Sequence, residues 1–230
     1  AAVPDYLAGN RNSLAGLRIG WDAGYALNDV EPEVAEAVKH TLEVLKKLGA
    51  QIVPVTLPEV GELVESWVPH CAVEAAVAHT HTFPARRAEY GPMLAGLLDL
   101  GNQLTATDYQ RMLLQRATHT GQLNAVLMQV DLLLMPAMPF AAPSTKRIAN
   151  LRQEPGYRRR LSRFTAPTDM SGHPTLTFPA GVTATGQPVA AQLVSGHLNE
   201  GLLVRAGGAF QAATNWHLRR PPVDALGTER

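Results

Sequence analysis

The sequence has no excess of charge of either sign. Across 230 residues, 20 lysines and arginines balance 20 aspartates and glutamates. Binding to nucleic acid or to an anionic membrane surface depends on an excess of basic residues. We therefore expect no nucleic acid and no membrane among the partners of this protein, except where basic residues gather locally.

Cysteine and long apolar runs are equally scarce. The single cysteine, Cys71, can form no internal disulfide and no zinc site built on several thiolates. Residues Ala1 to Asn10 lack the basic and then apolar pattern of a signal peptide. No apolar run approaches the roughly 20 residues of a membrane helix; Leu132 to Met135 is a short example. These absences favour a soluble protein of the reducing cytoplasm.

The residues that are present predict a packed α/β fold. Hydrophobic residues make up 46% of the chain and charged residues 17%, which is too apolar for disorder. Leu17 to Trp21 is typical of a strand that leads into a connecting loop, and Gln51 to Val55 is typical of a second strand. Between them, a helix beginning at Pro32 has an apolar face and ends at Gly49. A strand, helix and strand in this order favour parallel pairing.

The rest of the chain alternates between a helical middle and short strands. Glu59 to Met128 predicts three helices, broken at Pro84 and at Gly91-Pro92, and Thr105 with Asp108 has the spacing of a capping box. The later segments are predicted by their composition as a buried strand Leu132 to Met135, a surface loop Pro136 to Pro155, a helix Tyr157 to Arg163, strands Thr175 to Phe178 and Val189 to Val194, and a helix from Asn199 to Ala213. In that last helix, Ala213 is expected to face inward with Phe210, and Gly207 to permit close packing.

Two clusters with cysteine or histidine are weak candidates for chemistry. Cys71 follows His70, but consecutive helical side chains point about 100° apart, so we expect a buried structural thiol. Glu74, His79 and His81 lie in a helical pattern that does not place the two histidines on one face. We therefore expect no metal and no cofactor.

A basic segment offers a third candidate. Between Lys146 and Arg163 there are seven basic residues against Glu154 alone. Such a segment could hold a phosphate or an acidic group, although a solvated connection is the simpler interpretation.

The stretch Ser171-Gly172-His173 is the nearest approach to a serine hydrolase motif. It lies between Pro167 and Pro174 and has no Gly-x-Ser-x-Gly elbow. We interpret it as a rigid loop before a strand rather than as a nucleophile with its base.

That stretch also carries a resemblance to a known family. The sequence FTAPTDMSGHPTLTFPAG from Phe164 to Gly181, followed by GQPVAAQLV from Gly186 to Val194, resembles the carboxyl-terminal motif of the amidase signature family. LAGLRIG at Leu14 to Gly20 and DLLLMPA at Asp131 to Ala137 occur in the order that this family shows. The resemblance extends from about Val3 to Pro222.

The resemblance implies a mixed sheet layered between helices and an enzyme that hydrolyses carboxylic amides. It also implies a serine nucleophile, a second serine on a cis peptide and a lysine, all in an amino-terminal half around a Gly/Ser-rich segment that this sequence lacks. The four lysines of the chain are expected in solvated positions: Lys39, Lys46, Lys47 and Lys146. No catalytic residue is therefore carried over.

What this half can supply is a wall for the acyl side of the substrate. Open α/β sheets bind ligands at strand ends, where two loops of this sequence are expected. The candidate substrate-binding residues in those loops, for which ordinary packing is the alternative, are Pro136, Met138, Phe140, Phe164, Asp169 and His173.

The sequence thus predicts residues 1–222 as the carboxyl-terminal portion of an amidase domain and 223–230 as a polar tail. The expected partners are the amino-terminal half of the same enzyme, a small-molecule amide, and further copies in a homo-oligomer. Unpaired sheet edges should make the isolated chain associate or bind a hydrophobic dye. The alternative is a non-catalytic α/β module that binds through the basic segment.

Overall fold

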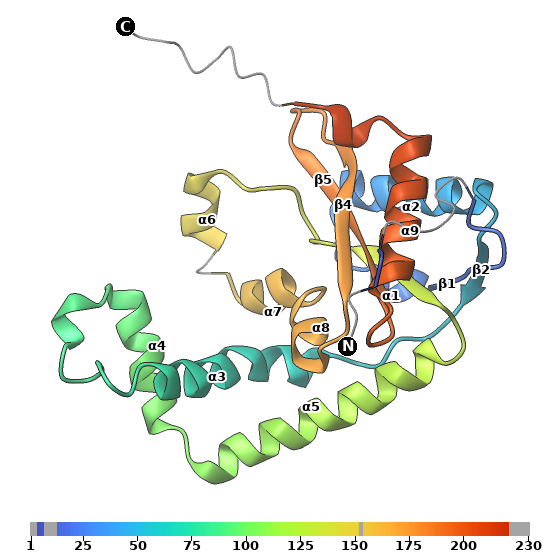
Figure 1. Cartoon of the computed structure of the whole chain (residues 1–230). Coiled ribbons are helices and arrows are strands. Elements are labelled where there is room, and N and C mark those ends of the chain that lie inside the picture. Colours follow the sequence, from blue (N-terminus) through green and yellow to red (C-terminus); the bar gives the residue numbers. More distant parts are fainter. Residues whose placement is uncertain (1–3, 7–12, 152–153, 221–230) are drawn as a thin grey trace, which may run out of the picture. The chain divides into compact units, whose positions relative to one another are not determined.

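The computed structural model describes residues 4–6, 13–151 and 154–220, which form two compact units (Figure 1). Unit 1 is drawn from residues 1–55, 130–142 and 174–230, and unit 2 from residues 56–129 and 143–173. The expected tail at 223–230 lies outside the described residues. No helix in the described part of the chain combines the length and the apolar character needed to cross a membrane.

Unit 1 is built on a five-stranded mixed sheet. The strands are β1 (Arg18–Trp21), β2 (Gln51–Pro54), β3 (Leu132–Pro136), β4 (Thr175–Val182) and β5 (Pro188–Ser195). Their order is β2-β1-β3-β5-β4, with β1 parallel to both β2 and β3, and β5 antiparallel to both β3 and β4. The predicted mixed α/β sheet is confirmed.

The predicted unit of strand, helix and strand at the start of the chain is also confirmed. Helix α2 (Pro32–Lys47) connects the parallel strands β1 and β2, and its buried face carries Val34, Val38 and Leu45. Gly49 follows the helix with φ +101°, a conformation that side chains with a Cβ rarely adopt.

The connection from β1 to α2 departs from the expected loop. It contains a short helix, α1 (Ala23–Leu27), because the Asp22 carboxylate accepts a hydrogen bond from the backbone N–H of Tyr25 at 2.9 Å. An aspartate in this position satisfies an amide that the first turn of a helix would otherwise leave unpaired.

One face of the sheet is covered by α2 and by α9 (Glu200–Ala213). Alternate residues of each strand enter this core, as the period of two along a strand requires. The rings of Phe178 on β4 and Phe210 on α9 lie 4.7 Å apart, and a Cβ on Gly207 would come within 2.3 Å of the Leu176 side chain. The expected close packing at Gly207 is confirmed, whereas Ala213 is exposed because it occupies the last position of the helix. A short 3-10 helix, η2 (Trp216–Leu218), follows.

Unit 2 is helical. Its elements are α3 (Gly61–Ala78), a 3-10 helix η1 (Arg87–Glu89), α4 (Pro92–Gln103), α5 (Ala106–Leu127), α6 (Thr145–Leu151), α7 (Tyr157–Ser162) and α8 (Ala166–Ser171). The three long helices agree with the predicted ones. Helix α6 lies inside the segment Pro136 to Pro155 that was expected to be an irregular loop, because the prolines of that segment precede or follow its seven helical residues.

Two local features determine the packing of α3, α4 and α5. Gly101 of α4 lies so close to α3 that a Cβ would come within 2.0 Å of the Ala72 carbonyl oxygen. The predicted capping box begins α5: Thr105 Oγ1 accepts from the Asp108 N–H at 3.1 Å, and the Asp108 carboxylate accepts from the Thr105 N–H at 3.2 Å.

Candidate functional site

The first predicted substrate loop follows β3 in unit 1. The Glu31 N–H donates to the Pro139 carbonyl at 2.8 Å, and the Glu31 carboxylate accepts from the Ala141 N–H at 3.3 Å. Pro136 and Phe140 are buried in this unit, and Met138 is half-buried. The loop is therefore rigidly held, and among its three candidate residues Met138 presents the most accessible side chain.

The second predicted loop, Phe164 to His173 in unit 2, contains the helix α8, contrary to expectation. Pro167 suits the first turn of a helix, and Gly172, with φ +73°, ends it in the left-handed conformation. Phe164 is buried beneath the guanidinium of Arg163, which lies 4.5 Å from the ring centroid. Asp169 is exposed.

A hydrogen-bond chain, buried at its serine and its histidine, connects the end of this segment to the exposed Asn124 of α5. His173 Nε2 lies 3.0 Å from Asn124 Oδ1, and His173 Nδ1 lies 2.9 Å from Ser171 Oγ. The amide oxygen only accepts, so Nε2 carries a proton, while the Ser171 hydroxyl lies within hydrogen-bond distance of both Nδ1 and, at 3.4 Å, the Thr168 carbonyl. The order serine, histidine and amide is that of an activated nucleophile, but Ser171 is only 7% exposed and His173 only 4%. Burial makes this chain a clamp on the segment, in agreement with the rigid loop that we predicted.

A second hydrogen bond from α5 holds α8 in place. The Arg116 guanidinium donates from Nε to the carbonyl of Met170. Neither Arg116 nor Asn124 was predicted from the sequence, because they precede their partners by 54 and 49 residues and belong to no local motif.

Cys71 is half-buried rather than fully buried as expected. Desolvation raises the pKa of its thiol, and the carboxylates of Glu74 and Asp169 raise it further. Partial burial likewise raises the pKa of the Asp169 carboxyl, although the residue as a whole is exposed. The neighbouring His70 donates from Nε2 to Glu74 at 3.0 Å. A thiol with a raised pKa stays protonated near neutral pH and is a poor nucleophile.

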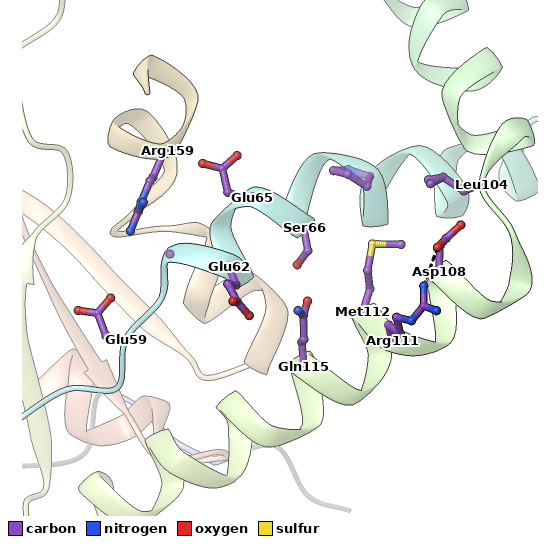
Figure 2. Close-up of a pocket in the computed structure, with 12 residues that line it drawn as sticks. Glu59, Glu62, Glu65, Ser66, Leu104, Asp108, Arg111, Met112, Gln115 and Arg159 are labelled. Atoms are coloured by element: carbon purple, nitrogen blue, oxygen red, sulfur yellow. Dashed lines mark hydrogen bonds and ion pairs between the residues drawn. The ribbon is translucent and has the colours of Figure 1, made fainter. Parts of the chain in front are cut away.

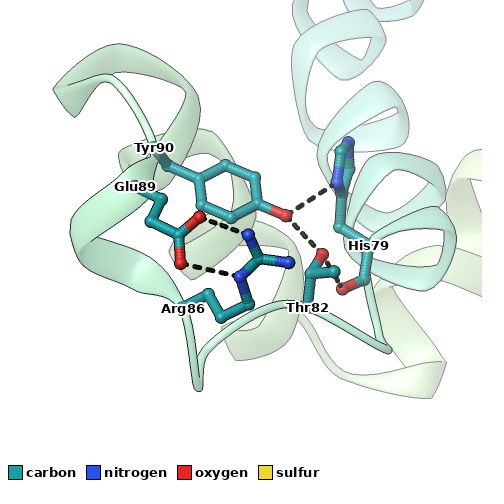
Figure 3. Close-up of polar contacts among 5 residues, drawn as sticks. All are labelled: His79, Thr82, Arg86, Glu89 and Tyr90. Carbon is teal, nitrogen blue, oxygen red and sulfur yellow. Dashed lines mark hydrogen bonds and ion pairs between the residues drawn. The ribbon is translucent and has the colours of Figure 1, made fainter.

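The structure places His79 and His81, the two histidines weighed for a metal site, in different surroundings. His79 Nδ1 lies 3.0 Å from the Tyr90 hydroxyl, which also contacts Thr82, and beside them Arg86 pairs with Glu89 (Figure 3). His81 is exposed. Within residues 4–6, 13–151 and 154–220, no group of three or more His, Cys, Asp or Glu side chains is arranged to hold a metal ion. The contact between His79 and Tyr90 closes the connection between α3 and α4.

The described residues of the basic segment lie in different environments. Arg159 packs its guanidinium against Gly61 of α3, where a Cβ would come within 2.3 Å, and Arg163 stacks on Phe164. Lys146, Arg147 and Arg158 are exposed, and Arg152 lies outside the described residues.

Comparison with known proteins agrees with the motif from Phe164 to Gly181. The family model described as Amidase matches residues 1–204. The chain is 31% identical to an amidase of Pseudomonas putida over an alignment of 234 positions, which covers 98% of this chain and 49% of that protein. It is 45% identical to the putative amidase AmiD of Mycobacterium tuberculosis over 152 residues, which are 66% of this chain and 32% of that protein.

Solved structures share the fold. A bacterial aryl acylamidase of the amidase signature family matches with a TM-score of 0.76 at 20% identity, over 96% of this chain and 49% of that one. A 6-aminohexanoate cyclic dimer hydrolase matches with a TM-score of 0.78 at 21% identity, over 97% and 50%. The chain thus spans about half the length of the relatives that it matches almost completely. On the match of the family model and the identity to the Pseudomonas putida protein, the chain belongs to the amidase signature family.

Proposed function

We propose that this chain is the carboxyl-terminal portion of an enzyme that hydrolyses carboxylic amides. The observation that carries the proposal is the match to an amidase over 98% of this chain and 49% of that protein. The catalytic serine, the second serine and the lysine then lie in the amino-terminal portion, which is the main partner of this chain. The two units together form one portion of an amidase domain, with 1–222 as its extent.

The six candidate residues take two roles under this proposal. The half-buried Met138 of unit 1 and the exposed Asp169 of unit 2 have side chains that a substrate can reach, each considered within its own unit. Pro136 and Phe140 in unit 1, and Phe164 and His173 in unit 2, support those loops from within because they are buried.

The cellular setting follows from the thiol chemistry. Cys71 is a free thiol with no second cysteine in the chain. A free thiol is stable in a reducing compartment, and we place the enzyme in the cytoplasm.

An activity assay tests the proposal directly. The 230-residue chain is purified alone and together with the co-expressed segment encoded immediately upstream of Ala1, and both samples receive an anilide, a cyclic amide and a short aliphatic amide. We expect no hydrolysis by the chain alone and hydrolysis of at least one amide by the combination.

Two results would contradict the proposal. One is the absence of an in-frame upstream segment with a lysine and a Gly/Ser-rich stretch. The other is a stable combination of the two portions that hydrolyses none of the amides, which would favour a non-catalytic module.

The edges of the sheet provide an independent test. In the described part of the chain, β2 pairs only with β1, and β4 pairs only with β5. Unpaired strand edges are templates for association. We expect the isolated chain to form a homo-oligomer in analytical ultracentrifugation or to bind a hydrophobic dye, and to do neither with the amino-terminal portion. If the isolated chain is a monomer that binds no hydrophobic dye, the proposal that it lacks a partner portion is contradicted.

A further inference from the structure

The two edges of the five-stranded sheet in unit 1 differ in what they offer to a further strand. β2 forms one edge and β4 the other. An edge strand can pair with another chain where its N–H and carbonyl groups point outward. Alternate residues of a strand point these groups to opposite sides, so the hydrogen bonds to the inner neighbour show which residues face outward.

The edge of β2 is blunted. The Gln51 N–H donates to the Leu17 carbonyl at 2.8 Å, so Gln51 and Val53 face β1. Ile52 and Pro54 face outward, and proline has no N–H. One outward donor in a strand of four residues is too little for a ladder.

β4 presents a longer edge. The Ser195 N–H donates to the Pro174 carbonyl at 3.1 Å, and these two residues lie opposite each other, next to the pair of Thr175 with Val194. In an antiparallel pair, such hydrogen-bonded positions alternate with positions whose groups point away. The residues of β4 that turn away from β5 are therefore Thr175, Thr177 and Pro179.

The other side of β5 gives the same alternation. The Ala137 N–H donates to the Ala190 carbonyl at 3.2 Å, so Ala190 and alternate residues after it face β3. In the register with β4, these residues lie opposite Pro179, Thr177 and Thr175. Both neighbours of β5 therefore agree that the two threonines face outward.

The first half of β4 is the part that is open to a partner. Pro179 has no N–H, and the strand bulges between Pro179 and Gly181. The 3-10 helix η2 contacts the strand, and its Trp216 lines a hollow together with Gly181. Thr175 and Thr177, by contrast, are exposed, and each offers an N–H and a carbonyl.

The two faces of β4 define the kind of strand that fits. Leu176 is half-buried and Phe178 is buried, and both pack toward α9. The threonine side chains lie on the opposite face, because side chains alternate along a strand. A paired strand therefore needs apolar side chains beside Leu176 and polar ones beside Thr175 and Thr177.

We propose that an amphipathic strand of the amino-terminal portion pairs with β4 at Thr175 and Thr177 and extends the sheet of unit 1 from that edge. The inference rests on the proposed function, because the match over 98% of this chain and 49% of the Pseudomonas putida amidase is what implies a second portion. Main-chain hydrogen bonds supply the ladder, and apolar side chains of the added strand cover the half-buried Leu176.

The hollow between α3 and α5 in unit 2 is a poor place for such a strand (Figure 2). It has a volume of about 830 Å³, but its walls are helices whose interior amides bond to carbonyls four residues earlier. Its charged lining residues favour water over an apolar strand face: Glu59, Glu62, Glu65, Asp108, Arg111 and Arg159. The edge of β4 is therefore the better junction.

Amide hydrogen exchange, resolved to single residues by NMR, tests the junction without any substitution. In the dilute 230-residue chain, the amides of Leu176 and Phe178 should exchange slowly because they bond to β5, and those of Thr175 and Thr177 should exchange fast. With the co-expressed upstream portion, we expect the two threonine amides to slow by about tenfold or more, while the Ile52 amide stays fast.

Two substitutions at one position separate the main chain from the side chain. Thr177→Pro removes the outward N–H, as Pro179 already does further along, and should weaken association of the two portions by about tenfold or more. Thr177→Ala keeps the N–H and should change association by less than about threefold. Slow exchange at Leu176 and Phe178 shows that β4 of the Thr177→Pro variant is still paired with β5.

The outcomes distinguish this junction from the proposed function. A complex that hydrolyses amides while Thr175 and Thr177 exchange as in the isolated chain refutes the junction and leaves the proposed function intact. Protected threonines in a complex without hydrolysis support the junction and contradict the proposed function. The junction is also overturned if no complex forms or if both variants associate equally with the upstream portion. Protection of the threonines in the isolated chain that grows with its concentration overturns it too, because the edge then belongs to a second copy.

Discussion

Replacing Gly101 by alanine should destabilise unit 2, although alanine is the better helix former. In a helix interior, alanine is favoured over glycine by about 0.8 to 1 kcal/mol. The new methyl group, however, would lie 2.0 Å from the Ala72 carbonyl oxygen, 2.5 Å from its carbon and 3.0 Å from the Ala76 Cβ. Backbone atoms cannot rotate away, so α3 and α4 must move apart. Overpacking of this kind costs about 1 to 3 kcal/mol, so after the gain in helix propensity is subtracted we expect a net loss of up to about 2 kcal/mol.

Gly96 on the same helix is the matched control. A Cβ there meets no heavy atom within 4 Å, so Gly96→Ala should stabilise the helix by about 0.5 to 1 kcal/mol. Urea unfolding followed by circular dichroism gives the free energy of unfolding, and hydrogen exchange of peptides from α3 and α4 locates the change. If Gly101→Ala proves as stable as Gly96→Ala, the tight packing of α4 on α3 is refuted.

Three further substitutions test contacts within one unit or the other. Hydrogen bonds from Arg18 hold the pKa of Asp131 below its usual value. Their contribution to the free energy of unfolding is therefore present above the unfolded pKa of about 3.8, and it is lost as the pH falls through the pKa of the folded state. Asp131→Asn should cost about 1 kcal/mol at pH 7 and flatten the acid limb of the stability curve in urea titrations from pH 7 to pH 2; an unchanged acid limb would contradict the pairing. Thr105→Ala should cost about 1 kcal/mol by removing the acceptor for the Asp108 N–H, with hydrogen exchange rising first in the opening turn of α5; uniform exchange along α5 would disagree. His173→Leu should cost about 1 to 3 kcal/mol because the buried Ser171 hydroxyl loses its hydrogen bond and the exposed Asn124 amide loses its partner, and a variant as stable as the parent in thermal unfolding would show that these contacts do not stabilise the protein.

Local rules predicted the elements whose signals are local. Pro32 and Gly49 define the ends of α2, and the spacing of Thr105 and Asp108 defines the start of α5. The helix α8 was missed because the prolines around Ser171-Gly172-His173 favoured a loop, whereas Pro167 occupies a first turn, the one place in a helix where its missing N–H costs nothing.

Which individual residues are buried was the property that the sequence predicted least well. Phe164 and His173 were proposed for a substrate wall, and the structure buries both within unit 2. The sequence cannot show this, because burial depends on Arg163 lying over the phenyl ring and on Asn124 reaching the imidazole from another helix.

The sequence by itself determined the family, the mixed α/β class and the order of the main elements, since each depends on motifs and periodicities that neighbouring residues express together. Only the tertiary structure decided which polar groups are satisfied. Asn124 and Arg116 meet partners 49 and 54 residues away. Long-range hydrogen bonds depend on how helices pack, and no local pattern encodes them.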